Sequence, residues 1–332
     1  MNSFGIDLGT SNIKIYSEAD DSILVEKNMI AIEGKNTLFA YGDSAYEMYE
    51  KAPSNIHISF PLSNGVIADI KNMEDLIKFF INDLSRNNIR PADYYITVPT
   101  DVTEVEKRAF YDLVKEADVK ARHVLVVEKA IADGLGVDVD VKNSQGVLIV
   151  DVGYDTTEIS ILSLGGIVRT RLIKTGGYKF DEAIKNAVRK HYNLVIGQKT
   201  AEIVKNNLRD YEAQGIEATV FGRDLVTGLP VERGLSTKFV CESMADQFRV
   251  VIDNIKVILE LTPPELAADI YKHGIYLTGG ASQTSHLASL ISKSTNLKVN
   301  EADNPATSVA IGLSKIIKDS NYRSLAYSIE GK

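Results

Sequence analysis

Residues 3–12 of the chain read Ser3-Phe-Gly-Ile-Asp7-Leu-Gly9-Thr10-Ser11-Asn12, and this stretch decides the fold. An apolar run of strand length ends at Asp7, a glycine provides a tight turn, and apolar residues resume at position 13 as a second strand. Residues 147–157 repeat the pattern as Val147-Leu-Ile-Val-Asp151-Val-Gly153-Tyr-Asp-Thr156-Thr157, with the second aspartate 144 residues after the first. We therefore expect two domains of similar fold that face each other across a cleft, with one such hairpin from each.

Both turns have the composition of a phosphate-binding loop. Glycine lets backbone N–H groups come close to a ligand, and several N–H groups that point into one concavity bind phosphate. Thr10 and Ser11 add hydroxyl donors, while Asp7 and Asp151 can hold the water molecules of a Mg²⁺ ion. A single hairpin of this kind more often serves only as a turn. Two copies half a chain apart favour a site that holds a polyphosphate from both sides.

A third segment suits the rest of a nucleotide. Residues 275–282 read Ile275-Tyr-Leu-Thr278-Gly279-Gly280-Ala281-Ser282, a strand that runs into a Gly-Gly turn before a helix. Missing Cβ atoms at this turn would let a flat base lie against the backbone. The chain contains no Gly-x4-Gly-Lys-Ser/Thr, which excludes a P-loop protein, and no Gly-x-Gly-x-x-Gly that opens a helix, which argues against a dinucleotide fold.

Composition limits the class of protein. The 332 residues carry a net charge of −8, and a chain this acidic is a poor candidate for binding nucleic acid. The single cysteine, Cys241, cannot form an internal disulfide, and no Cys–His spacing indicates zinc. No apolar run approaches the ~18 residues that a membrane helix needs. We expect a soluble protein of the cytoplasm.

Strand-length apolar runs alternate with amphipathic helical segments, which predicts an α/β protein. Helix 102–117 has Thr100 and Asp101 as N-cap candidates, and Thr262-Pro-Pro should end the helix near 261. Strands are expected at 3–8, 13–16, 94–98, 124–127, 146–152, 158–163, 167–173 and 274–277, and helices at 73–86, 102–117, 179–192, 198–207 and 244–261.

The two turns resemble the phosphate loops of the actin, Hsp70 and sugar-kinase superfamily, and Leu277-Thr-Gly-Gly resembles its adenosine loop. Further segments resemble the MreB family of bacterial filament proteins more specifically, and together they cover about residues 3 to 318. These segments are 65–69, 98–99 with 104–108, 163–168, 176–184, 197–202 and Gly222-Arg-Asp-Leu-Val-Thr-Gly-Leu-Pro230.

The resemblance implies an actin-like ATPase fold of two RNase H-like domains, each with a small inserted subdomain. Expected boundaries are 1–32, 66–145 and 313–332 for subdomain IA, 33–65 for IB, 146–181 and 243–312 for IIA, and 182–242 for IIB. It also implies ATP and Mg²⁺ in the cleft and head-to-tail polymerisation into paired antiparallel filaments at the inner membrane face. Partners would be further copies of the chain and other MreB paralogues, in a cell-shape or cell-motility role.

The same resemblance assigns residues to the ligand. Thr10, Ser11 and Asn12 would hold phosphates, and Gly153, Asp155 and Thr156 would face them from the other domain. Glu202 and Lys205 would contact the ribose, and Asp7 and Asp151 would organise Mg²⁺. The remaining nucleotide-binding positions are Gly176, Gly177, Gly279, Gly280, Ala281 and Ser282, and Thr156 is also a candidate catalytic residue.

Two departures from the family pattern concern ATP chemistry. Tyr154 and Asp155 stand where the family usually has glycines, and Asp155 would bring a negative charge close to the phosphates. The family also carries a Glu-Glu-Pro segment whose second glutamate is thought to position the attacking water. The gapless match sets Lys129 there, and an ammonium cannot accept a proton from water. A one-residue slip with a nearby deletion would instead give Glu128 that role. The favoured gapless match predicts weak ATP hydrolysis at most.

Membrane contact and competing functions complete the expectations. With only Met1-Asn2-Ser3 ahead of the apolar run that starts at Phe4, no amphipathic N-terminal helix is expected, and Ile89 beside Arg90 would give a bilayer only weak contact. Segment 316–327 is a second possible contact, although a solvated tail is favoured.

A sugar or acetate kinase would need a further aspartate base, and an Hsp70-like protein a further substrate domain. A plasmid-segregation filament is not expected to carry segment 222–230.

Overall fold

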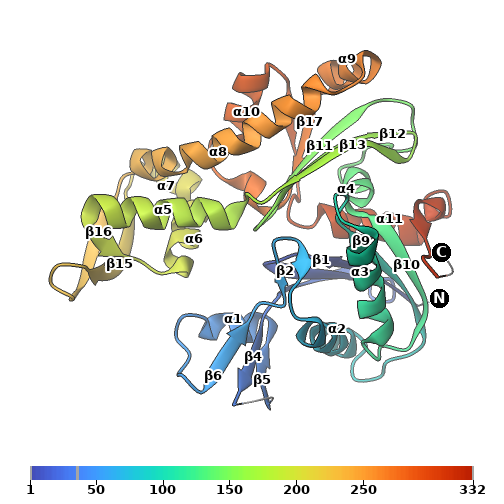
Figure 1. Ribbon diagram of the computed structural model, residues 1–332, viewed down its shortest axis with the longest axis horizontal. Helices are drawn as coiled ribbons and strands as arrows, with labels where there is room; N and C mark the ends of the chain where they lie inside the picture. The colour runs from blue at the N-terminus through green and yellow to red at the C-terminus, as the bar shows by residue number, and fades with distance from the viewer. Residues whose placement is uncertain (1, 35–36, 331–332) are drawn as a thin grey trace.

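The computed structural model describes residues 2–34 and 37–330 of the chain. Two halves, each built around one large β-sheet, lie on either side of a central cleft (Figure 1). Positions 1, 35, 36, 331 and 332 fall within the expected subdomains but lie outside the described residues.

The first half contains a six-stranded sheet. Strands β1, β2 and β3 form an antiparallel meander, and β9 and β10 continue the sheet parallel to β1. The strands, in sheet order, are β19 (Ala326–Tyr327), β10 (Ala121–Glu128), β9 (Ala92–Val98), β1 (Ser3–Leu8), β2 (Asn12–Ser17) and β3 (Ser22–Lys27). All six residues of β1 are buried, because sheet neighbours lie on both sides and helices cover both faces.

The second half repeats this topology. Strands β11, β12 and β13 form an antiparallel meander, and β17 and β18 continue it parallel to β11. The order is β13 (Gly166–Ile173), β12 (Thr157–Ser163), β11 (Val147–Val152), β17 (Ile275–Thr278) and β18 (Val299–Glu301). The predicted internal repeat is therefore confirmed at the level of strand order.

Helices cover the outer faces of both sheets. In the first half these are α2 (Ile70–Leu84) and α3 (Glu104–Glu116), and in the second half α5 (Gly177–Tyr192), α8 (Thr237–Glu260), α9 (Pro264–His273) and α10 (Leu287–Thr295). The predicted N-cap of α3 is wrong. Thr103 caps the helix in a reciprocal pair with Glu106, and Thr100 and Asp101 instead bond Thr170 and the Leu172 N–H of the other half.

Small sheets extend each half. One combines β5 (Thr37–Tyr41), β4 (Ile30–Glu33) and β6 (Ile56–Ser59) with helix α1 (Gly42–Met48), and β7 (Leu62–Ser63) pairs with β8 (Val66–Ile67). The other combines β14 (Leu194–Val195), β15 (Ala218–Asp224) and β16 (Pro230–Leu235) with α6 (Gln198–Asn206) and α7 (Leu208–Gln214). The first small sheet thus begins three residues before the expected boundary at 33, and α8 crosses the expected boundary at 242. The four-subdomain boundaries stay a prediction.

Helices α4 (Lys129–Gly136) and α11 (Ser308–Lys318) pack against each other between the two large sheets (Figure 1). Glycines make their close approach possible, because a Cβ on Gly312 would lie 1.7 Å from the Ala132 oxygen and one on Gly136 would lie 1.9 Å from the Ser308 oxygen. A hydrophobic cluster that includes Ile131, Ile149 and Leu313 surrounds this contact and joins the halves.

The end of the chain folds back onto the first sheet. After the 3₁₀ turn Arg323–Leu325, β19 pairs antiparallel with β10, and the Ile329 side chain is buried. The favoured solvated tail is therefore wrong for this segment. Within residues 2–34 and 37–330, no helix combines the length and apolar character needed to cross a membrane.

Candidate nucleotide-binding site

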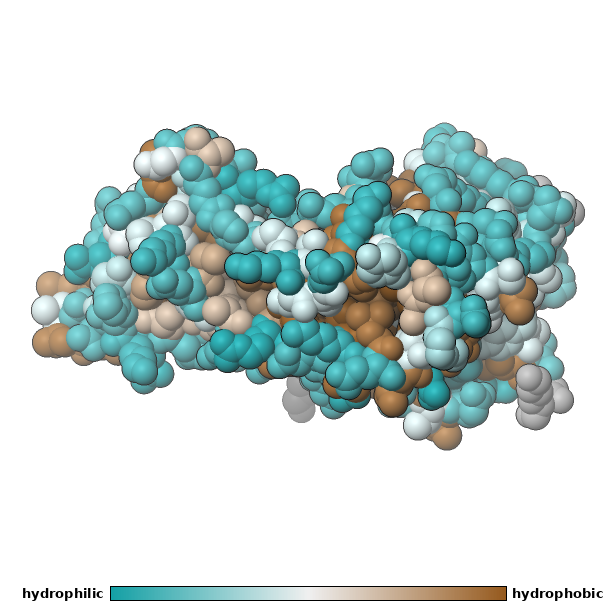
Figure 2. Space-filling model, turned by 90° about the horizontal axis from the view of Figure 1, so that it is seen from above, coloured by the Kyte–Doolittle hydropathy of each residue, from teal (hydrophilic) through white to brown (hydrophobic). Residues whose placement is uncertain are grey.

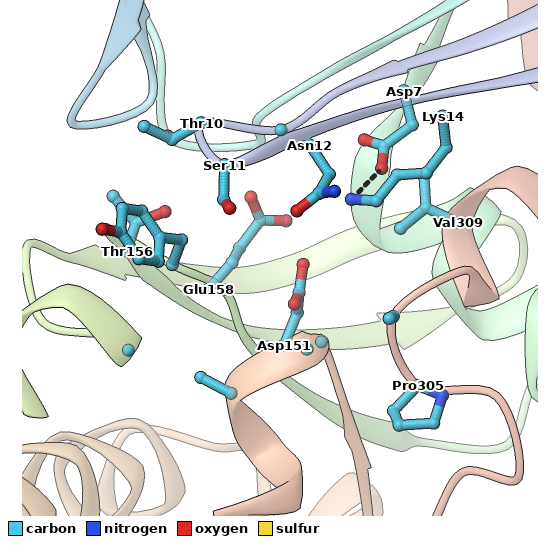
Figure 3. Close-up of a pocket in the computed structure, with 18 of the residues that line it drawn as sticks. Asp7, Thr10, Ser11, Asn12, Lys14, Asp151, Thr156, Glu158, Pro305 and Val309 are labelled. Atoms are coloured by element: carbon cyan, nitrogen blue, oxygen red, sulfur yellow. Dashed lines mark hydrogen bonds and ion pairs between the residues drawn. The ribbon is translucent and has the colours of Figure 1, made fainter. Parts of the chain in front are cut away.

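The two predicted turns face each other across a cavity of about 350 Å³ (Figure 3). Both close in the same way: the Gly9 N–H donates to the Asn12 oxygen at 3.1 Å, and the Gly153 N–H donates to the Thr156 oxygen at 2.9 Å. In each hairpin the aspartate occupies the same place, with Asp7 opposite Lys14 and Asp151 opposite Glu158 in the strand register. The repeat therefore brings two like-shaped loops to one cavity.

Most of the residues predicted from sequence line this cavity, although they come from distant segments. They are Asp7, Thr10, Ser11, Asn12, Lys129, Asp151, Gly153, Thr156, Gly177, Glu202, Lys205, Gly279, Gly280 and Ala281. Among the described residues, the four predicted catalytic or nucleotide-binding residues outside the lining are Glu128, Asp155, Gly176 and Ser282. Lys14, Lys27, Tyr154, Glu158 and Gln283 line it without having been predicted.

Lys129 forms the closest ion pair in the cavity. Its Nζ atom lies 2.5 Å from Asp151 Oδ2, and about a fifth of its side chain is exposed. Burial acts to lower the pKa of Lys129, but Asp151, Asp7 and Glu158 outweigh burial and raise that pKa overall. The lysine is therefore held as a cation against the carboxylates of both halves.

Glu128, by contrast, points away from the cavity. Its Oε1 atom accepts hydrogen bonds from Lys107 at 3.1 Å and from the Tyr327 hydroxyl at 2.8 Å. Strand β10 ends at Glu128 and helix α4 begins at Lys129, so successive side chains leave in different directions. This geometry supports the gapless match, in which Lys129 occupies the position facing the phosphates.

Asp7 is also paired with a lysine. Lys14 Nζ lies 3.1 Å from Asp7 Oδ2, as the dashed line in Figure 3 shows, and the Thr97 hydroxyl lies 3.3 Å from Asp7 Oδ1. Burial acts to raise the pKa of Asp7, but Lys14 and Lys129 hold that pKa below its usual value. Sequence reasoning could have found Lys14, because its position on β2 is opposite Asp7 in an antiparallel hairpin.

Glu158 adds a third carboxylate, which Figure 3 shows pointing into the space between Ser11, Asn12 and Asp151. Its Oε2 atom accepts a bond from the Thr100 N–H at 3.3 Å. Burial raises the pKa of Glu158 to about 7, with Lys129 opposing and Asp151 adding to that shift. Asp7, Asp151 and Glu158 thus form a group of carboxylates in which Lys14 and Lys129 are the counter-ions.

The carboxylate of Asp155 points toward the first half of the molecule. Its Oδ2 atom accepts a hydrogen bond from the Asn64 N–H at 2.8 Å, and burial raises the pKa of the carboxyl. Tyr154 lines the cavity instead, with its ring 5.7 Å from that of Tyr178. The expected repulsion between Asp155 and phosphate is therefore weakened, since Asp155 bridges the two halves.

The predicted adenosine loop packs closely against the end of β11 at its first glycine, and its contact with a base stays a prediction. Gly279 has φ +83°, and a Cβ there would lie 2.1 Å from Asp151 Oδ1. The Ser282 hydroxyl donates to the Gly279 oxygen at 2.7 Å, so it stabilises the loop from inside. Gly176 has a similar supporting role, because a Cβ there would lie 2.5 Å from the Gly153 oxygen.

The predicted ribose residues are held by neighbouring side chains. Lys205 is buried and lies 2.8 Å from Asp181, whose pKa burial raises to about 6. Glu202 accepts a hydrogen bond from the Tyr46 hydroxyl at 2.9 Å and lies 3.9 Å from Lys27. Both side chains thus line the cavity from the second half while contacting neighbouring protein groups, and their role toward a ribose stays a prediction.

The metal prediction meets a different arrangement from the one expected. Among residues 2–34 and 37–330, no group of three or more His, Cys, Asp and Glu side chains is suitably placed to hold a metal ion. Asp7 and Asp151, the two residues expected to organise Mg²⁺, each contact a lysine instead. The donor set as folded does not fit a divalent cation.

Ile89, the predicted membrane contact, is partly buried. It packs against the hydrophobic core of the first half, and Lys120 donates a hydrogen bond to its backbone oxygen at 2.9 Å. Only part of this side chain remains for a bilayer.

Known proteins match almost the whole chain. The model of the family described as MreB/Mbl protein matches residues 1–324. The cell shape-determining protein Mbl of Bacillus subtilis is 36% identical over 316 residues, 93% of each chain. The crystal structure of MreB 5 of Spiroplasma citri bound to AMPPNP has a TM-score of 0.90 and 32% identity over 98% of each chain.

A more distant structure shares the fold. The MamK double helical filament has a TM-score of 0.80 and 22% identity, covering 96% of this chain and 99% of that one. The predicted α/β class and actin-like fold are therefore confirmed.

Proposed function

Because the chain belongs to the MreB/Mbl family of actin-like cell-shape proteins, we propose that it binds ATP in the central cleft and assembles with further copies into filaments. The observation that carries the nucleotide part is the pair of matched turns, Gly9–Asn12 and Gly153–Thr156, on opposite walls of one cavity. Nucleotide-bound MreB 5 of Spiroplasma citri supports the same site, and the MamK filament has the same fold.

In this proposal the phosphates lie between the two turns. Thr10, Ser11 and Asn12 contact them from the first half, and Gly153 and Thr156 from the second. Glu202 and Lys205 contact the ribose, and the backbone of Gly279, Gly280 and Ala281 lies against the base. The magnesium ion implied by the family is left out of the proposal, because Asp7 and Asp151 are paired with lysines.

We further propose that hydrolysis is slow. The side chain that faces the phosphates from the start of α4 is Lys129, and its ammonium has no lone pair to accept a proton. Absence of a general base typically lowers a rate by about 10²–10⁴-fold. Filaments would then persist in the ATP-bound form for longer than those of relatives with a glutamate at this place.

Phosphate release from the full chain tests this proposal. With ATP in excess and Mg²⁺ supplied in place of the lost lysine charge, Lys129→Glu should raise the rate by at least about tenfold, since it restores a proton acceptor in the cleft. Glu128→Gln is the matched control, and it should leave the rate unchanged because Glu128 contacts Lys107 and Tyr327 outside the cavity. A rate that falls with Glu128→Gln and does not rise with Lys129→Glu would assign the base to Glu128.

Sedimentation of the same proteins with ATP tests assembly. We expect the chain to pellet with ATP and to stay in the supernatant without nucleotide. Direct membrane contact through Ile89 is not part of the proposal, because that side chain packs against the core.

A further inference from the structure

Lysine side chains lie among the carboxylates inside the cavity. Three carboxylates, Asp7, Asp151 and Glu158, gather there from the two halves, and the lysines Lys14 and Lys129 lie among them. Lys14 contacts Asp7 at 3.1 Å, and Lys129 contacts Asp151 at 2.5 Å. Each aspartate of the repeated hairpins thus has a lysine as its counter-ion.

Three of the four aspartate oxygens that a hydrated metal ion could use already contact other side chains of the protein. Asp7 uses Oδ2 for Lys14 and Oδ1 for the Thr97 hydroxyl. Asp151 uses Oδ2 for Lys129, and its Oδ1 lies close to the backbone of Gly279. Mg²⁺ keeps several waters and requires nearly octahedral geometry, so it would have to displace these partners.

The position of Lys129 is fixed by the fold. It is the first residue of α4, directly after the buried end of β10, and α4 is locked against α11 by Gly136 and Gly312. Only about a fifth of the side chain is exposed. A positive charge fixed at this point repels a second cation strongly, because the Coulomb energy of close charges is large away from bulk water.

An ammonium also has the chemistry to contact phosphate. It carries three N–H donors, so a lysine that gives one to Asp151 keeps two for phosphate oxygens. Lysine binds phosphate as a point charge, as a small metal ion does.

We propose that Lys129, with Lys14, replaces the divalent cation in this cleft, so that the chain binds nucleoside di- and triphosphates without Mg²⁺. This inference rests on the proposed nucleotide site and specifies how that site neutralises the phosphates. The ligand is then the free nucleotide anion rather than its magnesium complex.

Calorimetric titration of the full chain with ADP and with AMPPNP, in Mg²⁺ and in EDTA, tests the inference. For the unmodified protein the dissociation constant in EDTA should lie within about threefold of that in Mg²⁺. Lys129→Met should weaken binding in EDTA by at least about tenfold, because it removes the charge at similar side-chain length. Lys238→Met removes an exposed lysine far from the cleft and should change neither value.

The outcomes separate this inference from the proposed function. Tight binding in Mg²⁺ that weakens about tenfold or more in EDTA would overturn the inference alone. No binding of either nucleotide in either condition would overturn the proposed nucleotide site. The two conditions on unmodified protein decide between these outcomes even if Lys129→Met does not fold.

Discussion

At the junction of β10 and α4, two consecutive side chains reach different surroundings. Glu128 ends β10 and reaches Lys107 and Tyr327, whereas Lys129 begins α4 and reaches Asp151. A shift of one residue would exchange these environments. Sequence alone left both choices open, because it predicts where a strand ends only to within a few residues.

Asp133 gives a prediction about pH at the same scale. It is buried on α4 and accepts a 2.5 Å hydrogen bond from the Thr278 hydroxyl, and burial together with Asp151 raises its pKa to about 7. The folded state therefore keeps its proton at pH values where the unfolded chain has lost it. The free energy of unfolding should therefore fall as the pH rises from about 4 to about 7. This group contributes at most about 1.4 kcal/mol per pH unit to that fall.

Asp133→Asn isolates that contribution. The variant keeps an acceptor for Thr278 but has no titrating group, so its stability should depend less on pH than that of the unmodified protein. Urea unfolding at pH 5 and pH 7.5 measures how the unfolding free energy of each protein changes with pH. Asp138→Asn, on the exposed side of the same segment, is the control. If the unfolding free energies of Asp133→Asn and the unmodified protein change equally with pH, Asp133 is not the source of the pH dependence.

At the scale of elements, α6 receives its N-terminal cap from the opposite half of the molecule. Its own N-cap, Gly197, has no side chain, and the Glu50 carboxylate accepts hydrogen bonds from the N–H groups of Gln198 at 2.9 Å and Lys199 at 3.4 Å. A carboxylate at a helix N-terminus satisfies free N–H groups and the helix dipole. This contact closes the mouth of the cleft beside Tyr46 and Glu202.

Glu50→Ala should therefore weaken the contact between the two halves at the mouth of the cleft. We expect a loss of about 0.5–1 kcal/mol in unfolding free energy and a faster release of bound nucleotide. Stopped-flow displacement of a fluorescent ATP analogue measures the release rate. Glu47→Ala, an exposed position on α1, is the matched control and should leave release unchanged. If both variants release nucleotide equally fast, Glu50 is not a closing contact.

The elements themselves were largely predictable. Strand 3–8 was predicted with its observed bounds, and the apolar runs of β11 and β12 were predicted to within one residue, because buried strands are continuous apolar runs. The cap of α3 was missed, since Thr100, Asp101 and Thr103 all have N-cap chemistry and only the backbone decides among them. The small sheets were missed as well, because their short strands are partly exposed and lack a clear apolar pattern.

For the whole molecule, the repeat was the decisive sequence signal. It predicted two facing halves and placed Asp7, Gly9, Asp151 and Gly153 in one site. It did not predict the bridges across the cleft, such as Asp155 to Asn64, because these depend on how the two halves are oriented. Lys14 and Glu158 were missed because their residue types are common on exposed strands.

Assembly gives a prediction at this scale. The β15–β16 hairpin projects from one end of the molecule, and Figure 2 shows apolar side chains at that end. Val226 is 80% exposed, and Phe221 and Leu229 are also exposed. If the hairpin contacts a second copy in the filament, burial of one valine contributes about 1.5 kcal/mol, so Val226→Asp should raise the critical concentration roughly tenfold.

Pelleting over a range of protein concentrations measures this shift. Val226→Ile keeps an apolar side chain and should assemble normally, and both variants should bind nucleotide as the unmodified protein does. If Val226→Asp pellets like the unmodified protein, the hairpin is not part of the filament contact.

The glycine contact between α4 and α11 has a mechanical consequence. Backbones that touch at Gly136 and Gly312 can roll about the point of contact but have no slack in which to slide. We therefore expect the two halves to move against each other by rotation about this contact rather than by sliding. A rotation of a few degrees there produces a displacement that grows with distance, so a ligand bound between the halves would change the separation of the far ends of the molecule.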